Sequence, residues 1–175
     1  MVQVALWKTI DIPVKLVLAA GGGRNVGFFK SDRVSTNLRT RISASEVFSL
    51  MEDFVQRSKV FKATGGVHSA ALCDTKSILV FSEDIGRHNA IDKVFGECLL
   101  EDIKTDNRLI ITSGRISSEI LLKVAKRNIP VLISKSAPTD MGVKLAKDLG
   151  VTLIGFARGK RMNVYTNDWR VVGNG

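Results

Sequence analysis

Glu83-Asp84-Ile85-Gly86-Arg87-His88-Asn89 is the first of four polar runs that each follow a short apolar segment. The other three are Ser113-Gly114-Arg115, Ser134-Lys135-Ser136-Ala137-Pro138 and Phe156-Ala157-Arg158-Gly159-Lys160-Arg161-Met162-Asn163. The apolar segments before them are strand-like, at residues 78–81, 109–112, 131–133 and 151–155, and amphipathic helix patterns follow the first three runs. Strands that alternate with helices predict an α/β protein with a mostly parallel sheet. In such a sheet the loops at the carboxyl ends of the strands lie along one edge.

The four polar runs should therefore meet at one edge of the sheet. Small residues in these runs leave room for a ligand. The basic side chains that they bring to the edge are Arg87, His88, Arg115, Lys135, Arg158, Lys160 and Arg161. The sequence thus predicts a binding edge for a bulky anionic ligand.

The composition is that of an ordinary globular protein, with 175 residues, 45% hydrophobic and 25% charged. The length suits one domain with a sizeable core. No apolar run approaches the roughly 20 residues of a membrane span, and no signal peptide opens the chain. The two cysteines, Cys73 and Cys98, are too few for a disulfide framework, so we expect a cytoplasmic protein that does not associate with a membrane.

The net charge of +9 needs a partner or a structural explanation. Part of it is structural, because Lys123, Lys126 and Arg127 come late in one helix pattern, where cations favour the negative end of the helix dipole. Nucleic acid would also suit a basic protein. Basic runs interleaved with aromatic residues are absent, however, and only 6% of residues are aromatic, which disfavours nucleic acid as the partner.

The remaining elements follow from local signals. Ser43 and Glu46 form a capping box before an amphipathic helix at 44–58. We expect a turn at 62–66, a strand at 67–73, a helix at about 88–101, a helix capped by Ser117, a helix that starts at Thr139 and ends at Gly150, and a last strand at 162–165.

Residues 1–42 differ from the rest and resemble the remnant of a longer amino-terminal region. Segments 2–7 and 12–18 could be strands there, and the three glycines at 21–23 require a loop or tight turn. We therefore divide the chain into residues 1–42 and a main α/β domain at 43–172.

The titratable residues of the edge allow both a functional and a structural reading. His68, in Thr64-Gly65-Gly66-Val67-His68-Ser69-Ala70, and His88 both fall at loop edges, so a ligand contact and a structural role are about equally supported. Asp84 either caps the following helix or holds Arg87. Cys98 has the helical spacing of a core residue, and Cys73 also favours an inert role.

Three familiar sites are excluded by their motifs. The chain lacks the histidine, glutamate and paired cysteines of a deaminase zinc site, so we expect no protein-bound metal. It has no phosphate-binding loop with the Walker lysine. The glycines at 21–23 also lack the spacing of a dinucleotide fingerprint.

Several of these segments together resemble the FdhD/NarQ family of formate dehydrogenase accessory sulfurtransferases. They are Thr64-Gly65-Gly66-Val67-His68-Ser69-Ala70-Ala71-Leu72, Glu83-Asp84-Ile85-Gly86-Arg87-His88-Asn89-Ala90-Ile91-Asp92-Lys93, Ser136-Ala137-Pro138-Thr139 and Gly155-Phe156-Ala157-Arg158-Gly159-Lys160-Arg161-Met162-Asn163-Val164-Tyr165. The match extends over residues 43 to 171, and the two longest segments together are highly specific.

The resemblance implies a fold, a reaction and partners. The fold is a three-layer αβα sandwich like that of cytidine deaminase, without the zinc site, in a homodimer. Members take a persulfide sulfur from a cysteine desulfurase and pass it to bis-molybdopterin guanine dinucleotide, the molybdenum cofactor that then enters formate dehydrogenase. GDP can stand in for one end of this cofactor. The resemblance assigns guanine dinucleotide binding to the loop at 156–161.

Combined with the rest of the edge, this loop gives a predicted cofactor-binding set. It comprises Phe156, Ala157, Arg158, Gly159, Lys160, Arg161, Asn163, His68, Asp84, Arg87, His88, Asn89, Ser113, Arg115 and Ser136.

The sulfur-carrying cysteines of the family have no counterpart in this sequence. Members carry a Cys-x-x-Cys loop shortly before the helix that matches 44–58, where this chain reads Ala19-Ala20-Gly21-Gly22-Gly23-Arg24. A sulfur nucleophile must be a thiolate, so no catalytic residue carries over, and Cys73 is the weak substitute. Three functions stay open: a sulfurtransferase accessory protein, a non-catalytic module of the same fold that binds the cofactor or a partner, and a nucleic-acid-binding protein.

Overall fold

The computed structural model describes residues 14–18, 24–28 and 40–173. The chain divides into two compact units, residues 1–33 and 34–175. In the first unit, β1 (Val14–Leu18) pairs with β2 (Arg24–Phe28) in an antiparallel hairpin, so a strand forms within the expected segment 12–18. The expected strand at 2–7 and the glycine turn at 21–23 lie outside the described residues. The division at residues 42 and 43 stays a prediction.

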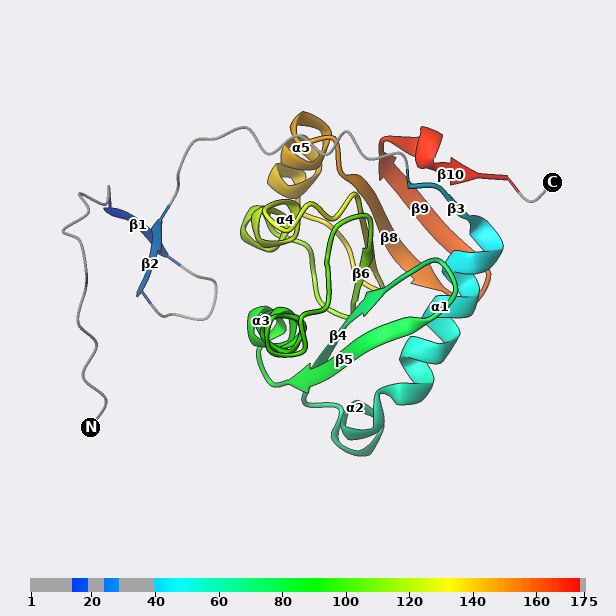
Figure 1. The fold of residues 1–175 in the computed structure, drawn as a ribbon, viewed down its shortest axis with the longest axis horizontal. Coiled ribbons are helices and arrows are strands. Elements are labelled where there is room, and N and C mark those ends of the chain that lie inside the picture. Colours follow the sequence, from blue (N-terminus) through cyan, green and yellow to red (C-terminus); the bar gives the residue numbers. More distant parts are fainter. Residues whose placement is uncertain (1–13, 19–23, 29–39, 174–175) are drawn as a thin grey trace. The chain divides into compact units, whose positions relative to one another are not determined.

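The second unit alternates strands and helices along most of its length (Figure 1). Its elements are β3 (Ile42–Ser43), α1 (Ala44–Arg57), α2 (Lys59–Thr64), β4 (His68–Cys73), β5 (Ile78–Asp84), α3 (Arg87–Leu100), β6 (Leu109–Thr112), α4 (Ser118–Ala125), β7 (Val131–Ser134), α5 (Asp140–Asp148), β8 (Thr152–Arg158), β9 (Arg161–Thr166), a 3-10 turn (Asp168–Arg170) and β10 (Val171–Val172).

The central sheet has six strands in the order β5-β4-β6-β7-β8-β9. β6, β7 and β8 are parallel neighbours, while β4 is antiparallel to both β5 and β6. Four of the six strands, β5 to β8 without β4, therefore point the same way, and β9 returns antiparallel to β8. This mixed sheet, mostly parallel in direction, confirms the predicted fold class.

Helices cover both faces of the sheet (Figure 1). One apolar core joins the sheet to α3, α4 and α5 through fully buried side chains such as Ile91 and Leu121. A second core joins the opposite face to α1 through Val47, Leu50 and Phe54. Two cores on opposite faces of one sheet make the three-layer αβα arrangement that was expected.

The helix α1 begins where its sequence signals placed it. The Ser43 hydroxyl accepts a hydrogen bond from the Glu46 amide at 3.2 Å, and the Glu46 carboxylate accepts one from the Ser43 amide at 2.7 Å. The Phe54 ring packs edge-on against Phe81 of β5, with 5.7 Å between ring centroids. Full burial of such a side chain contributes about 1.5–3 kcal/mol. The capping box and the apolar face thus fix α1 beside the sheet edge.

The expected turn at 62–66 is wrong, because α2 occupies most of that segment. The Glu83 carboxylate accepts hydrogen bonds from the amides of Val60 and Phe61, at 3.0 Å each, and so caps the start of α2 from a distant strand. Gly65, with φ of 64°, ends the helix. The helix depends on a partner more than twenty residues away along the chain.

Candidate functional site

The polar runs meet at one edge of the sheet. The amide of Lys135 donates to Thr112 O at 3.0 Å, and the amide of Phe156 donates to Ser136 O at 3.1 Å. Because β4 runs antiparallel, its first residue, His68, also lies here, opposite Asp84 in the sheet register. These bonds connect the loops that follow β6, β7 and β8. The predicted edge is therefore present, with the start of β4 added to it.

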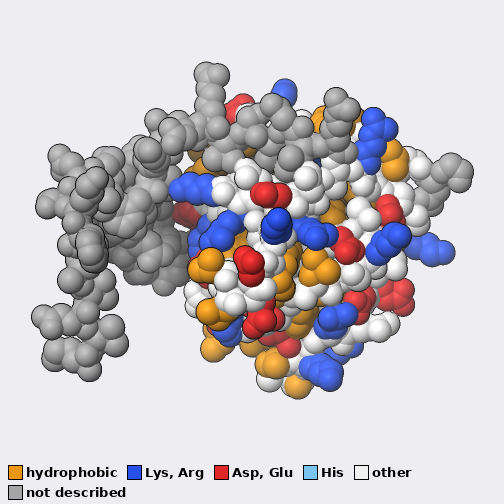
Figure 2. Space-filling view, viewed as in Figure 1, with side chains coloured by type: hydrophobic (Ala, Val, Ile, Leu, Met, Phe, Trp, Pro, Cys, Tyr) orange, Lys and Arg blue, Asp and Glu red, His pale blue; other side chains and the backbone are white. Residues whose placement is uncertain are grey.

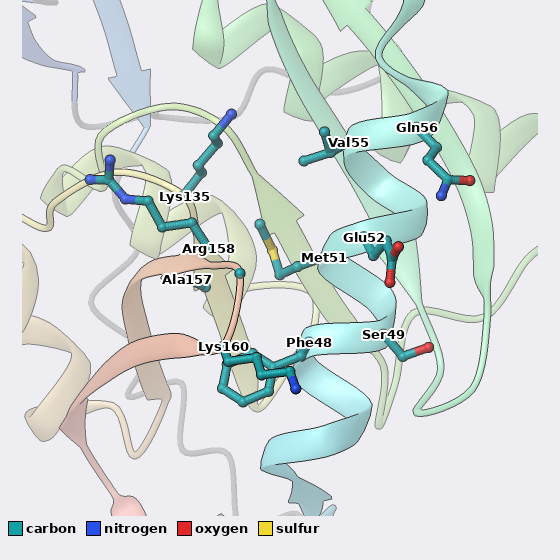
Figure 3. A pocket seen from close by; sticks show the side chains of 11 residues that line it. Phe48, Ser49, Met51, Glu52, Val55, Gln56, Lys135, Ala157, Arg158 and Lys160 are labelled. Atoms are coloured by element: carbon teal, nitrogen blue, oxygen red, sulfur yellow. The ribbon is translucent and has the colours of Figure 1, made fainter.

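A groove of about 780 Å³ lies between α1 and the turn that joins β8 to β9. Figure 3 shows Met51 and Val55 pointing from α1 toward the side of the groove where Lys135 and Arg158 lie. The lining residues are Phe48, Ser49, Met51, Glu52, Val55, Gln56, Lys135, Ala157, Arg158, Gly159 and Lys160. One wall is thus largely apolar and the other is basic.

The basic wall is built on an irregular part of β8. The register shifts between Gly155 and Arg158, and Phe156 has a φ of 52°, a conformation unusual for a residue with a side chain. Such backbone costs on the order of 1–3 kcal/mol and tends to occur at functional sites. The Arg158 guanidinium lies 5.7 Å from the centroid of the Phe156 ring. The bulge and the ring contact place Arg158 at the groove.

The cations of the groove are available to an anion. Within the described part of the chain, Lys135, Arg158 and Lys160 have no carboxylate within ion-pair distance. Elsewhere basic and acidic side chains are interspersed, as the face in Figure 2 shows. Unpaired cations beside a low-dielectric wall attract and concentrate anions.

A smaller pocket of about 270 Å³ adjoins the groove, because Val55 and Lys135 line both. The other residues that line it are Phe54, Ser58, Phe61, Gly65, Gly66, Val67, His68, Ser69 and Ser113. The Nδ1 atom of His68 lies 3.3 Å from the Ser113 hydroxyl. The sequence prediction included His68 and Ser113, and the structure brings the two together here.

Two arginines increase the positive potential beside His68. Burial, then the charges of Arg87 and Arg115, lower the pKa of the His68 imidazole. Arg87 can lie this close because Gly114 has no side chain, since a Cβ there would lie 2.8 Å from Arg87 Cβ. Arg87 Nε is also buried without a hydrogen-bond partner among the described residues. Both arginines therefore belong to the edge, outside the lining of either pocket.

Other predicted residues lie away from the groove. His88 Nε2 is 3.9 Å from the Glu119 carboxylate near α4, on the opposite face of the sheet from α1. Arg161 and Asn163 lie in β9, beyond the turn, and line neither pocket. Their roles as ligand contacts stay predictions that this geometry does not support.

Asp84 takes neither of its two expected roles. Its carboxylate accepts hydrogen bonds from the Gly86 amide at 2.9 Å and the Asn89 side-chain amide at 3.2 Å, and it pairs with Lys93 at 3.0 Å. The cap residue of α3 is Gly86, and Arg87 points elsewhere, toward Gly114. Asp84 and Asn89 thus stabilise the turn before α3.

The α1 wall was missed by sequence reasoning. Phe48, Met51 and Val55 follow the helical period and were explained as core residues. Val55 is 36% exposed, however, and the three side chains line the groove. Nothing in the sequence distinguishes an apolar residue at a groove from one in the core.

Cys73 is unsuited to replace the missing sulfur carrier. It ends β4, at the edge of the sheet opposite to His68, and its side chain is fully buried. Burial, followed by the charge of Asp74, raises the pKa of the Cys73 thiol well above its ordinary value. Cys98 is also buried, and burial raises its pKa. Neither thiol is exposed as a nucleophile.

Two further findings concern only the described residues. No group of three or more histidine, cysteine, aspartate or glutamate side chains is placed to hold a metal ion. No helix there has the length and apolar character that a membrane span would need.

Comparison with known proteins identifies the family. The model of the FdhD/NarQ family matches residues 11–172. The chain belongs to the FdhD/NarQ family. Among the curated relatives of this FdhD/NarQ chain, the sulfur carrier protein FdhD of Bacillus subtilis is 46% identical over 153 residues, which is 86% of this chain and 58% of the relative. The sulfur carrier protein FdhD of Bacillus pumilus is 43% identical with the same coverage. The chain therefore spans about 58% of the length of these relatives.

Solved structures agree with the FdhD/NarQ assignment. A protein from Desulfotalea psychrophila, described as a formate dehydrogenase accessory protein, superposes with a TM-score of 0.75 at 29% identity. The match covers 91% of this chain and 71% of that one. A diaminohydroxyphosphoribosylaminopyrimidine deaminase from Thermotoga maritima has a TM-score of 0.52 at 11% identity, over 65% of this chain and 37% of its own. This second likeness concerns the fold alone, which the FdhD/NarQ chain shares with a deaminase.

Proposed function

We propose that this chain acts in formate dehydrogenase maturation by binding a guanine end of bis-molybdopterin guanine dinucleotide in the groove beside α1. The observation that carries the proposal is the basic turn. Arg158 and Lys160, without ion-pair partners among the described residues, face an apolar helix wall in the segment for which the family resemblance implies guanine dinucleotide binding.

The two walls suit the two parts of the ligand. Arginine and lysine bind phosphate oxygens through charge-assisted hydrogen bonds, and arginine can do so with two parallel bonds. Phe48 and Met51 offer apolar surface to a purine ring. A ring on one wall and a diphosphate on the other is the arrangement that we expect for GDP.

The comparisons support this role without testing it. The curated relatives are named sulfur carrier protein FdhD, and the Desulfotalea protein is described as a formate dehydrogenase accessory protein. Formate dehydrogenase is therefore the proposed recipient of the cofactor, and a cysteine desulfurase is the proposed sulfur donor. Both are cytoplasmic partners in this proposal.

A second candidate function is cofactor binding without sulfur transfer by residues 1–175. Relay of sulfur requires an exposed thiolate to attack the outer sulfur of the desulfurase persulfide, form a new sulfur–sulfur bond and release the desulfurase thiolate. Cys73 and Cys98 are both buried with raised pKa values. Their burial favours this second candidate for the chain as given.

We expect neither cysteine to accept sulfur. After incubation with a cysteine desulfurase and cysteine, a persulfide-selective label followed by mass spectrometry should find no adduct on Cys73 or Cys98 in the folded chain. Urea-unfolded protein serves as the control, because both thiols are accessible to alkylation there. An adduct on Cys73 in the folded chain would make that residue the carrier and reject the second candidate.

Co-purification tests the binding proposal. Expressed in cells that make the cofactor, the chain should purify with molybdenum and release a guanine nucleotide on acid hydrolysis. We propose a two-fold homodimer, in which each subunit receives one guanine end, so light scattering on the same sample should give twice the chain mass. Purified protein without molybdenum or nucleotide would contradict the proposal, and a monomer mass would contradict the dimer.

A further inference from the structure

The smaller pocket behind Lys135 has polar contacts that a nucleotide in the groove does not use. Apart from His68 and Lys135, its polar side chains are three serines, Ser58, Ser69 and Ser113. None of the described residues that line it carries a carboxylate. The nearby Glu83 is already engaged, because its two oxygens accept the amides of Val60 and Phe61. The pocket is therefore defined by its hydroxyls, one imidazole and one ammonium.

The hydroxyl hydrogens of Ser58 and Ser69 are committed to the protein. The Ser58 hydroxyl donates to Phe54 O at 2.9 Å. It must then accept in its 2.9 Å contact with the Ser69 hydroxyl, so Ser69 is the donor there. Ser69 also lies 3.4 Å from a Glu83 oxygen, a longer second acceptor for the same hydrogen. Neither serine retains a hydrogen to offer to a ligand.

Ser113 fixes the tautomer of His68. The Ser113 oxygen accepts a hydrogen bond from the Ser69 amide at 2.9 Å. The acceptor within reach of its own hydrogen, among the described residues, is His68 Nδ1 at 3.3 Å. A neutral imidazole that accepts at Nδ1 carries its proton on Nε2. The network therefore presents His68 as a hydrogen-bond donor through Nε2.

Lys135 supplies the second donor. Its Nζ lies 5.5 Å from the centroid of the Phe61 ring, and Phe61 lines the smaller pocket but not the groove. The lysine stem thus borders the groove while the ammonium lies on the side of the smaller pocket. With the serine hydrogens committed, the side-chain donors left in this pocket are the Nε2–H of His68 and the ammonium of Lys135. Free donors without free acceptors select an oxyanion.

We propose that this pocket binds a small tetrahedral oxyanion of the phosphate type through His68 Nε2–H and the Lys135 ammonium, at a site separate from the nucleotide groove. Its volume of about 270 Å³ exceeds several times the roughly 30 Å³ that one water occupies. Arg87 and Arg115, which act on His68 from α3 and from the loop after β6, add positive potential without lining the pocket. The same chemistry would bind a free phosphate or a phosphate of the cofactor.

Titration with inorganic phosphate, followed by NMR of the ¹⁵N-labelled His68 imidazole, tests this site. The nitrogen shifts without phosphate should report the Nε2–H tautomer, and phosphate should shift the Nε2 signal to saturation. Lys135→Ala should weaken phosphate binding about tenfold or more, because it removes one of two charge-assisted contacts. Lys76→Ala removes an exposed lysine between β4 and β5, at the opposite edge, and should leave binding unchanged. Ser113→Ala should release the tautomer and shift both imidazole nitrogens.

The same titration at saturating GDP separates the two possible sources of phosphate. Phosphate that still shifts His68 with an affinity within about threefold of the GDP-free value supports a separate site. Competition by GDP, a His68 signal that phosphate does not move, or equal losses in Lys135→Ala and Lys76→Ala would overturn the inference. Phosphate binding by protein that fails to bind GDP would leave this site standing and reject the proposed function instead.

Discussion

Replacing Arg158 and Lys160 together with alanine should weaken GDP binding about a hundredfold, or on the order of 3 kcal/mol. Both side chains line the basic wall of the groove, and neither has an ion-pair partner among the described residues. Each charge-assisted hydrogen bond to a phosphate is worth about 1.5–3 kcal/mol, reduced here because the wall is open to solvent. Isothermal calorimetry at fixed ionic strength measures the loss.

Arg161→Ala is the matched control for this variant. Arg161 opposes Arg158 in the register of β8 and β9, carries the same charge and is also exposed, but it does not line the groove. GDP affinity should stay within about threefold of the unmodified protein. Equal losses in the control and the double variant would mean that net charge, and not the groove, determines binding.

Gly155→Val should destabilise the second unit by about 3 kcal/mol. A Cβ at Gly155 would lie 2.9 Å from Tyr165 Cε2, 3.0 Å from Pro138 Cδ and 3.2 Å from Ser136 O. These contacts come from both neighbours of β8, so no single movement relieves them. The free energy of unfolding in urea measures the loss.

Gly96→Ala is the counterpart in an open position. Gly96 lies within α3, and a Cβ there would meet nothing within 4 Å. Alanine should stabilise the protein by about 0.5–1 kcal/mol, because glycine loses more backbone entropy on folding. A Gly155→Val variant as stable as the unmodified protein would show that β8 and its neighbours are less tightly packed than the structure has them.

Local signals explain why most of the fold could be predicted. Ser117 and Thr139 accept hydrogen bonds from the amides of Ile120 and Gly142, so the caps that start α4 and α5 were visible in the sequence. The strands at 109–112 and 131–134 are short buried runs bounded by polar residues. The helix α2 was missed because its cap, Glu83, lies in another strand and has no local signature.

The candidate site was predictable in its position but not in all its members. Parallel strand direction alone placed Lys135 and Arg158 at one edge. Arg161 and Asn163 were assigned with them because they are close in sequence, yet the chain reverses at Gly159 and carries both into β9. The apolar wall was missed because α1 is distant in sequence from the turn that it faces. Sequence proximity overstated one part of the site and hid the other.

A crystal structure of the chain with GDP tests most directly whether the groove beside α1 holds the guanine nucleotide. We expect the diphosphate within hydrogen-bond distance of Arg158 and Lys160, with the purine ring against Phe48 and Met51. A nucleotide bound instead on the α3 face near His88, or no nucleotide at saturating GDP, would contradict the proposed site.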